Sequence, residues 1–181
     1  VTGVQTCALP ILLVATTGHS AEQREELVAL HHSVPLLIAA NTSLVVNVLM
    51  KLASEAARVL KGRDFDVEII ERHHRFKVDS PSGTALKFAE LIETEMGLER
   101  RLYGREGIVG RRTSKEIGLH AVRVGDNVGE HTIIFSTIGE TLELVHKGSG
   151  LDSYVKGALA AVKFLATKKA GLYQMSDVLG L

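Results

Sequence analysis

Cysteine is almost absent from this sequence, because the only one among its 181 residues is Cys7. Residues 1–11 read VTGVQTCALPI, which resembles the in-frame translation of a sequencing-library adaptor. We interpret this segment as an artefact and leave it out of the fold prediction. The rest of the chain then has no thiol, which excludes disulfide bonds and thiolate catalysis and is typical of a cytoplasmic protein.

An excess of charge of either sign is also missing, since 21 lysine and arginine residues are balanced by 21 aspartate and glutamate residues. Such a chain has no overall attraction to nucleic acid or to an anionic membrane, so we expect neither as a partner. Long apolar runs are missing too. Residues 8–15 are too few to cross a bilayer, and no basic segment precedes them as in a signal peptide.

The basic residues are nevertheless unevenly spread. Six of them gather in a glycine-rich region that we interpret as a loop: Arg100, Arg101, Arg105, Arg111, Arg112 and Lys115. We favour a solvated loop, because charged side chains are mostly exposed. The alternative is a rim that attracts a dianionic substrate or the phosphates of a cofactor.

Three motifs of known chemistry are absent. Side chains of metal-binding type gather in one segment: Glu71, His73, His74 and Asp79. Their spacing matches no zinc pattern such as H-E-x-x-H, so we expect no metal. Ser82 lacks the G-x-S-x-G setting of a nucleophilic serine. No G-x-G-x-x-G turn follows a first strand, where a Rossmann enzyme holds the pyrophosphate of its cofactor.

The first part of the chain alternates between strands and helices. Residues 12–17 and 34–40 are apolar runs that predict buried strands. Ser20 and Gln23 predict a capped helix between them, and a long helix follows the second strand. This order is typical of a parallel sheet covered on both faces.

The second part of the chain changes to successive strands. A strand at residues 65–71 and a helix at 84–96 come first. Three strands and a last helix follow, at residues 119–124, 130–137, 141–146 and 152–166. Glycines separate the three strands, which predicts an antiparallel meander. We therefore predict two subdomains, one with a parallel sheet and one with an open sheet and helices.

Two adjacent histidines, His73 and His74, come where a predicted strand ends. A histidine can donate a proton near neutral pH, and neighbours on an extended segment point to opposite sides, so we expect two different roles. Lys77 is near enough to reach the same pocket, where it would neutralise a carboxylate or donate a proton. A bare histidine pair is more often solvated and without function, as we interpret His31 and His32.

The helix at residues 84–96 is preceded by Pro81, Ser82, Gly83 and Thr84. Proline stiffens the approach, glycine lets the backbone come close, and a helix start presents N–H groups that bind anions. Alone, such a segment is more often an ordinary helix cap. Because the histidines and the lysine lie just upstream, we predict that it binds a carboxylate.

Residues 68–86, which read EIIERHHRFKVDSPSGTAL, resemble the signature of the 4-hydroxy-tetrahydrodipicolinate reductases of lysine and diaminopimelate biosynthesis. Residues 125–132, GDNVGEHT, and the ending GLYQMSDVLGL are similar to the same family, and we expect the former to shape the substrate domain and its subunit contacts. The resemblance implies that His73 is the proton donor and Lys77 a second donor or charge partner. It also implies that the substrate carboxylates are held by His74, Ser82, Gly83 and Thr84.

The resemblance implies NADPH or NADH as the cofactor, with two contact loops. The first loop, commonly GTTG in the family, corresponds to Ala15, Thr16 and Thr17, with alanine in place of the first glycine. The second loop, commonly AANFS, corresponds to Ala39, Ala40, Asn41 and Thr42, with Thr42 in place of the usual aromatic residue. Both segments also read as ordinary strand ends, so neither identifies a cofactor by itself.

The resemblance also implies the domain organisation, within an α/β fold class. We expect the carboxyl-terminal part of a Rossmann-like dinucleotide-binding domain at residues 12–41 and 152–181. Residues 42–151 are expected to form an α+β substrate and tetramerisation domain with an open mixed sheet.

The similarity runs from residue 12 to residue 181, so we expect an amino-terminally truncated enzyme, inactive as given. In its intact form it is expected to be a cytoplasmic homotetramer acting on a small dicarboxylate. The alternatives are a cofactor-free dicarboxylate-binding or oligomerisation module, and a relative that acts on another cyclic imine or aldehyde.

Overall fold

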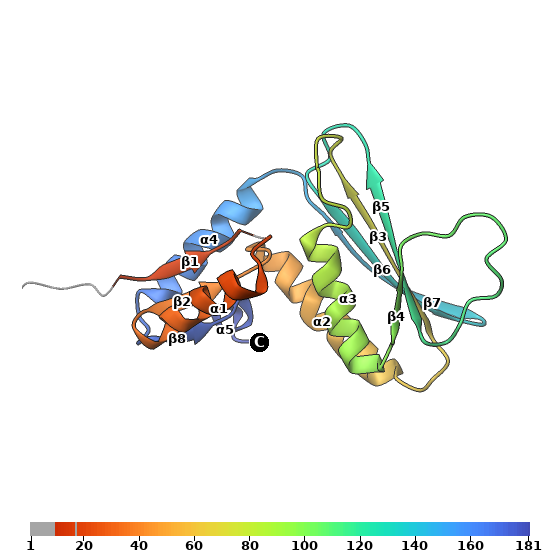
Figure 1. Ribbon diagram of the computed structural model, residues 1–181, viewed down its shortest axis with the longest axis horizontal. Helices are drawn as coiled ribbons and strands as arrows, with labels where there is room; N and C mark the ends of the chain where they lie inside the picture. The colour runs from red at the N-terminus through yellow and green to blue at the C-terminus, as the bar shows by residue number, and fades with distance from the viewer. Residues whose placement is uncertain (1–9, 17) are drawn as a thin grey trace, which may run out of the picture. The chain divides into compact units, whose positions relative to one another are not determined.

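The structure is a computed structural model that describes residues 10–16 and 18–181. Its described residues form two compact units (Figure 1). Unit 1 comprises Val1–Leu44 and Asp152–Leu181, and unit 2 comprises Val45–Leu151. The expected adaptor segment therefore lies mostly outside the described residues, as does the predicted cofactor contact Thr17.

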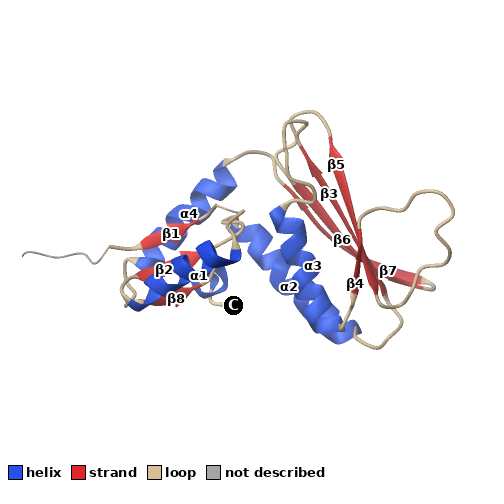
Figure 2. Cartoon of the chain, in the orientation of Figure 1, coloured by secondary structure: helices blue, strands red, loops and turns tan. Residues whose placement is uncertain are grey.

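Unit 1 contains a three-stranded parallel sheet in the order β1-β2-β8 (Figure 2). Its strands are β1 (Leu12–Val14), β2 (Pro35–Ile38) and β8 (Gly171–Tyr173). The central strand β2 is the most buried, as its unbroken apolar sequence predicts for a parallel sheet. Strand β8 was not predicted, because three residues are too few to show a period.

The helices of unit 1 are α1 (Ala21–Ala29), α4 (Asp152–Leu165) and α5 (Met175–Leu179), with a 3₁₀ turn at Leu30–His32. The predicted capping box at α1 is confirmed: Gln23 N–H donates to Ser20 Oγ over 3.2 Å, and Ser20 N–H donates to Gln23 Oε1 over 2.9 Å. The core joins strand and helix residues: Leu37, Ala39, Ala161, Leu165 and Met175.

Helix α4 comes very close to the loop after β2. A Cβ placed on Gly157 would lie 1.7 Å from the carbonyl oxygen of Thr42. The Thr42 hydroxyl in turn donates to the carbonyl of Tyr154 over 2.9 Å. Only glycine fits at position 157, so this contact fixes the helix against the loop that carries residues 41–43.

Unit 2 contains a five-stranded mixed sheet in the order β4-β5-β3-β6-β7. Its strands are β4 (Arg100–Leu102), β5 (Glu116–Arg123), β3 (Asp66–His73), β6 (Glu130–Thr137) and β7 (Glu140–Lys147). Strand β3 is central, parallel to β5 and antiparallel to β6. The predicted α/β class with an open mixed sheet is confirmed.

The predicted antiparallel meander is wrong at its first strand. Strands β6 and β7 do pair antiparallel, but β5 pairs with β3 and β4, both in parallel. Strand β3 lies between β5 and β6, so their glycine-containing connection crosses the end of β3 instead of making a hairpin. Turn residues show where the chain reverses and not which strand it joins.

Helices α2 (Leu44–Leu60) and α3 (Gly83–Met96) both pack against this sheet (Figures 1 and 2). They share a core with the alternate residues of the central strands, including Val67, Ile69, Ile117, Ile133 and Phe135. Alternation along β3 therefore places Glu71 and His73 on the same, helix-covered face. Helix α3 begins at an N-cap, Ser82, whose hydroxyl accepts from Ala85 N–H over 3.2 Å.

Several arginines of the basic region at residues 100–115 bind carboxylates, which the favoured solvated-loop interpretation did not predict. Arg101 makes two hydrogen bonds of 2.6 Å to Glu93. Arg105 and Arg112 both bind Glu68, on the opposite face of β3 from His73. Glu68 lies 37 positions from Arg105 and 44 from Arg112, so local composition could not reveal this shared partner. None of the helices in the described part of the chain is long and apolar enough to span a membrane.

Candidate functional site

His73 is the last residue of β3, which extends two residues beyond its predicted end. Its Nδ1 lies 2.6 Å from Oε2 of Glu71, the previous residue on the same face of the strand. Both side chains are buried, with exposed fractions of 7% for His73 and 1% for Glu71. The imidazole is thus oriented by a carboxylate that water does not reach.

The Glu71 carboxylate also binds Arg123, the last residue of β5. Nη1 and Nη2 of the guanidinium donate to the two carboxylate oxygens over 2.8 Å each. The backbone N–H of Ser82 donates to Oε1 over 3.0 Å. Burial raises the pKa of Glu71, but the hydrogen bonds from His73, Arg123 and Ser82 outweigh it and lower the pKa to about 2. Glu71 is therefore ionised at neutral pH.

The start of α3 lies against this carboxylate. Ser82 uses its N–H for Glu71, and its hydroxyl lies 3.3 Å from Nε2 of His131. The N–H of Ser82 is therefore engaged within the protein. Gly83 is the first helical residue and its N–H has no carbonyl partner within the helix, as expected of a first turn. Of the predicted carboxylate-binding segment, the N–H of Gly83 is therefore the group that the helix leaves for an anion.

His74 and Lys77 belong to the turn that follows β3. The N–H of Lys77 donates to the carbonyl of His74 over 3.1 Å, and its ammonium group lies 2.7 Å from the carboxylate of Asp79. Nδ1 of His74 is buried and has no hydrogen-bond partner among the described residues. An unsatisfied buried nitrogen is costly unless a ligand or water completes it, so this atom is suited to bind a substrate oxygen.

His131 joins the cluster through the register of the sheet. It lies opposite Glu71 on β6, and its ring contacts that of His73 edge to face at a centroid distance of 5.4 Å. Burial lowers the pKa of His131 to about 3, and the nearby charges of His73 and His146 add to the effect. His131 is therefore a neutral hydrogen-bonding residue at physiological pH.

The sequence motifs do not single out three residues that the structure brings into this cluster. Glu71 was considered only as a metal ligand, His131 only as part of a structural segment, and Arg123 not at all. The shared face of Glu71 and His73 follows from strand alternation, so that contact could have been found. Arg123 and His131 reach the site through β5 and β6, whose pairing with β3 the sequence does not reveal.

The predicted cofactor loops lie at the carboxyl ends of β1 and β2 in unit 1. A pocket of about 140 Å³ opens there and is lined by Thr16, Gly18, His19, Arg24, Leu27, Ile38 and Ala40. Ligands bind at this edge of parallel sheets, next to the strand ends. The structure thus brings Thr16 and Ala40 together, next to the exposed Ala15.

The other predicted cofactor contacts are not in this pocket lining. Ala39 is 8% exposed and belongs to the core of unit 1, where its N–H bonds the carbonyl of Val14 over 2.9 Å. Asn41 accepts from the N–H of Ser43 over 2.8 Å. Thr42 is 5% exposed and binds Tyr154. The side chains of Ala39 and Thr42 therefore face the protein interior.

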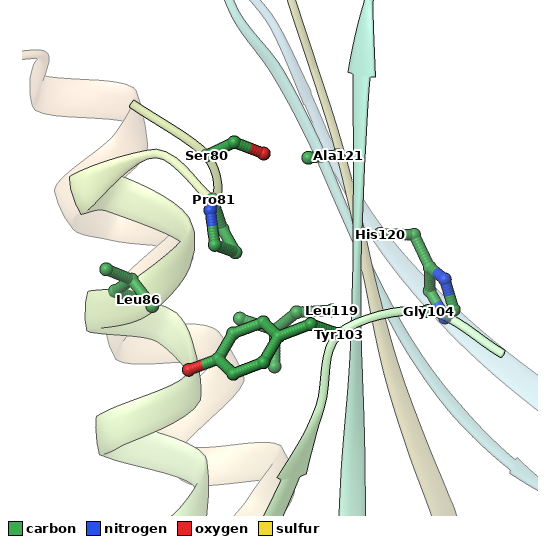
Figure 3. A pocket seen from close by; sticks show the side chains of 8 residues that line it. All are labelled: Ser80, Pro81, Leu86, Tyr103, Gly104, Leu119, His120 and Ala121. Atoms are coloured by element: carbon green, nitrogen blue, oxygen red, sulfur yellow. The ribbon is translucent and has the colours of Figure 1, made fainter. Parts of the chain in front are cut away.

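A second pocket, of about 580 Å³, lies beside the start of α3 in unit 2 (Figure 3). Its lining combines one side of α3 and the preceding loop with the β4–β5 edge: Ser80, Pro81, Leu86, Tyr103, Gly104, Leu119, His120 and Ala121. The ring of Tyr103 lies between α3 and β5. No predicted catalytic residue lines this pocket, although Ser80, Pro81 and Leu86 belong to the signature segment at residues 68–86.

Comparisons with known proteins agree with this geometry. A family model described as dihydrodipicolinate reductase, C-terminus, matches residues 45–179. The 4-hydroxy-tetrahydrodipicolinate reductase of Rhodopirellula baltica is 53% identical over 175 residues, which are 94% of this chain and 62% of that protein. The enzyme of the same name from Syntrophus aciditrophicus is 45% identical over 172 residues, 93% of this chain and 64% of that protein.

A solved structure, the dipicolinate-bound dihydrodipicolinate reductase from Paenisporosarcina sp. TG-14, has a TM-score of 0.67 at 28% sequence identity. It covers 90% of this chain, which spans 62% of that structure. The chain thus spans less than two thirds of the length of these relatives. Since the family model covers most of its residues, the chain belongs to the dihydrodipicolinate reductase family and contains that family's carboxyl-terminal domain.

Proposed function

We propose that this chain is the substrate-binding part of a 4-hydroxy-tetrahydrodipicolinate reductase that uses NADPH or NADH. One observation carries the proposal: a buried, carboxylate-oriented histidine lies beside a helix start and a lysine-bearing turn. This arrangement offers a proton donor and two kinds of group that bind carboxylates, which reduction of a cyclic dicarboxylic imine requires.

The proposed reaction balances without a further reactant. Substrate, reduced nicotinamide and one proton give tetrahydrodipicolinate, oxidised nicotinamide and water. The nicotinamide supplies the hydride. His73 donates the proton to the carbon next to the one that accepts the hydride, and Lys77 acts as a second donor or as a charge partner.

The substrate carboxylates are proposed to bind at the start of α3 and at the turn after β3. Gly83 and Thr84 form the first turn at the positive end of the helix, and Ser82 fixes that end through Glu71 and Ala85. His74 offers its unpartnered Nδ1 to a carboxylate oxygen. The solved relative named above is dipicolinate-bound, and dipicolinate, like the proposed substrate, is a six-membered nitrogen-containing ring with two carboxylates.

The cofactor is proposed to bind unit 1. The pocket lined by Thr16 and Ala40 lies at the strand ends, where the nicotinamide part of a dinucleotide would fit, and Ala15 and Thr17 adjoin it in sequence. The loop residues Ala39, Asn41 and Thr42 would contribute through their backbone, since Ala39 and Thr42 have buried side chains. In this proposal residues 12–41 and 152–181 serve the cofactor.

Residues 42–151 are proposed to bind the substrate and to assemble the protein into a homotetramer. Within unit 2, α2 and α3 pack on the face of the sheet that carries His73, while Thr132 and Val145 pair on the other face. The part of this second face on β6 and β7 is proposed as the contact between subunits. The proposal also places the protein in the cytoplasm, where the reduced nicotinamides are.

The experiment is a reductase assay on a full-length protein that carries this chain, with the His73→Gln variant. The expected result is a fall in turnover of about 10²- to 10⁴-fold, with a smaller change in KM, because general acid catalysis is lost. The matched control is His32→Gln, which changes an exposed histidine at the 3₁₀ turn of unit 1 and should leave turnover unchanged.

Unchanged turnover of the His73→Gln variant would remove His73 from the mechanism. The assay is paired with calorimetric titration of pyridine-2,6-dicarboxylate. Binding of this ligand by an intact protein that transfers no hydride would favour the alternative, a cofactor-free dicarboxylate-binding module.

A further inference from the structure

The buried ion pair between Glu71 and Arg123 has no role in the proposed reaction so far. The Glu71 carboxylate has four nitrogen contacts, two of them to Arg123, and all four are within 3.0 Å. Oε1 of Glu71 accepts from Arg123 Nη2 and from Ser82 N–H, while Oε2 accepts from Arg123 Nη1 and faces His73 Nδ1. Each carboxylate oxygen therefore has two nitrogen neighbours, and the carboxylate has one fixed orientation.

An ionised carboxylate can only accept hydrogen bonds. The 2.6 Å contact between Glu71 Oε2 and His73 Nδ1 therefore requires the hydrogen to be on Nδ1. In the neutral imidazole the other nitrogen, Nε2, is then the one without a proton. Nε2 is consequently the atom that gains and loses a proton, and no described residue is found within hydrogen-bond distance of it.

We propose that Glu71, locked by Arg123, is a positioning residue that selects the Nδ1–H tautomer of His73 and directs Nε2 to the substrate. This inference rests on the proposed function for its catalytic part, whereas the tautomer is a property of the chain alone. Arg123 also connects this pair to the segment between β3 and α3, since its Nη2 donates to the carbonyl of Asp79 over 2.7 Å.

A purely stabilising role explains less of the geometry. Buried ion pairs contribute little net stability, because removing two charges from water offsets most of their attraction. A stabilising pair would also need no histidine at its end. Here the carboxylate makes its shortest contact, 2.6 Å, to the imidazole of the proposed proton donor.

The test begins with the tautomer of His73, measured by two-bond ¹H–¹⁵N correlation spectra of the chain at a pH where the ring is neutral. The wild-type chain is expected to show a protonated Nδ1 and an unprotonated Nε2. This measurement needs no variant, cofactor or activity. A protonated Nε2 in the wild-type chain would overturn the proposal.

The variant Glu71→Gln should reverse the tautomer. Oε1 faces two nitrogens that can only donate, Ser82 N–H and Arg123 Nη2, whereas Oε2 faces one such nitrogen, Arg123 Nη1, and His73 Nδ1, which can give up its hydrogen. The amide oxygen of the variant is therefore expected at the Oε1 position and its NH₂ group at the Oε2 position beside His73. An NH₂ donor requires an unprotonated Nδ1, so the hydrogen moves to Nε2. A variant that keeps the Nδ1–H tautomer would show that Glu71 does not select it.

The matched control is Glu68→Gln on the same strand. Glu68 is likewise an ionised, arginine-bound carboxylate, and its pKa is about 2 because hydrogen bonds from Arg105, His120 and Arg112 outweigh the effect of burial. It lies on the other face of β3 and does not contact His73. The Glu68→Gln chain is expected to keep the wild-type tautomer of His73.

The catalytic part is tested in the full-length protein. Glu71→Gln should lower kcat by about 10²- to 10⁴-fold with little change in KM, because the substrate still binds but meets the wrong tautomer. Wild-type kcat in this variant would overturn the positioning role. A full-length wild-type protein without reductase activity would instead refute the proposed function, and the tautomer result would still stand or fall independently.

Discussion

Folding lowers the pKa values of two residues of the site, His131 and Glu71. The pKa of His131 is lowered by burial from 6.5 to about 3. The unfolded chain therefore binds more protons between pH 6.5 and pH 3, and the free energy of unfolding falls as the pH falls through this window. Glu71 adds a second loss at lower pH, between 4.5 and about 2, because its folded-state pKa is also lowered.

We predict that His131→Asn makes the stability of the chain less sensitive to acid. The wild-type slope attributable to one such group is at most about 1.4 kcal/mol per pH unit, and the variant should lose it between pH 6.5 and pH 3. Urea unfolding across this window measures the slope. His32→Asn, at an exposed position, is the control, and equal slopes for His131→Asn and the wild type would contradict the argument.

Candidate site residues could be predicted from the sequence where they lie together in one short segment. His73, His74, Lys77 and the start of α3 could all be proposed as site residues from residues 68–86, because they are local in the chain. Arg123 could not, since its contact with Glu71 spans 52 positions in sequence. A residue that enters a site through strand pairing is found only when the neighbours of each strand are known.

At the scale of elements, the close approach of α4 to the loop after β2 gives a sharp test. We predict that Gly157→Ala destabilises unit 1, because the new Cβ would meet the Thr42 carbonyl oxygen at 1.7 Å. The expected cost is about 1–3 kcal/mol, although alanine is intrinsically the better helix former by about 1 kcal/mol. Thermal unfolding of the variant and the wild type measures it.

Gly150→Ala is the control for this substitution. A Cβ at position 150 meets nothing within 4 Å, so the change should alter the free energy of unfolding by less than about 0.5 kcal/mol. A Gly157→Ala chain as stable as the wild type would mean that α4 and the loop can separate without loss.

The predicted elements were largely found, but their neighbours were not. The helices α1, α3 and α4 and the strands β6 and β7 lie close to their expected positions, because each has a clear period or cap. The three-residue strands β4 and β8 were missed. The order of the larger sheet was mispredicted, because β5 joins β3 through a crossover that contains α3.

At the scale of the whole molecule, the proposed homotetramer predicts which face of the unit 2 sheet is buried on assembly. Val145 is 46% exposed and pairs with Thr132 on the face opposite His73. We expect Val145→Glu to shift the protein from tetramer to smaller species, because it would place charges in an apolar contact. Light scattering coupled to size-exclusion chromatography measures the mass in solution.

Leu159→Glu is the matched control for assembly. Leu159 is a comparably exposed apolar residue, at 55%, but it lies on α4 in unit 1. Its replacement should leave the mass unchanged. A Val145→Glu protein of wild-type mass would exclude this face as the subunit contact.

The path of the chain around β3 has a consequence for folding. The connection from β5 to β6 crosses the carboxyl end of β3, where Val124 N–H bonds the carbonyl of His73 over 2.9 Å and Arg75 N–H bonds that of Gly125 over 3.0 Å. The end of β3 is thus enclosed by strands that are synthesised later. Such non-local pairing is slow to form. We therefore expect the imidazole to reach its functional position in the final, cooperative step of folding, so that intermediates have no competent site.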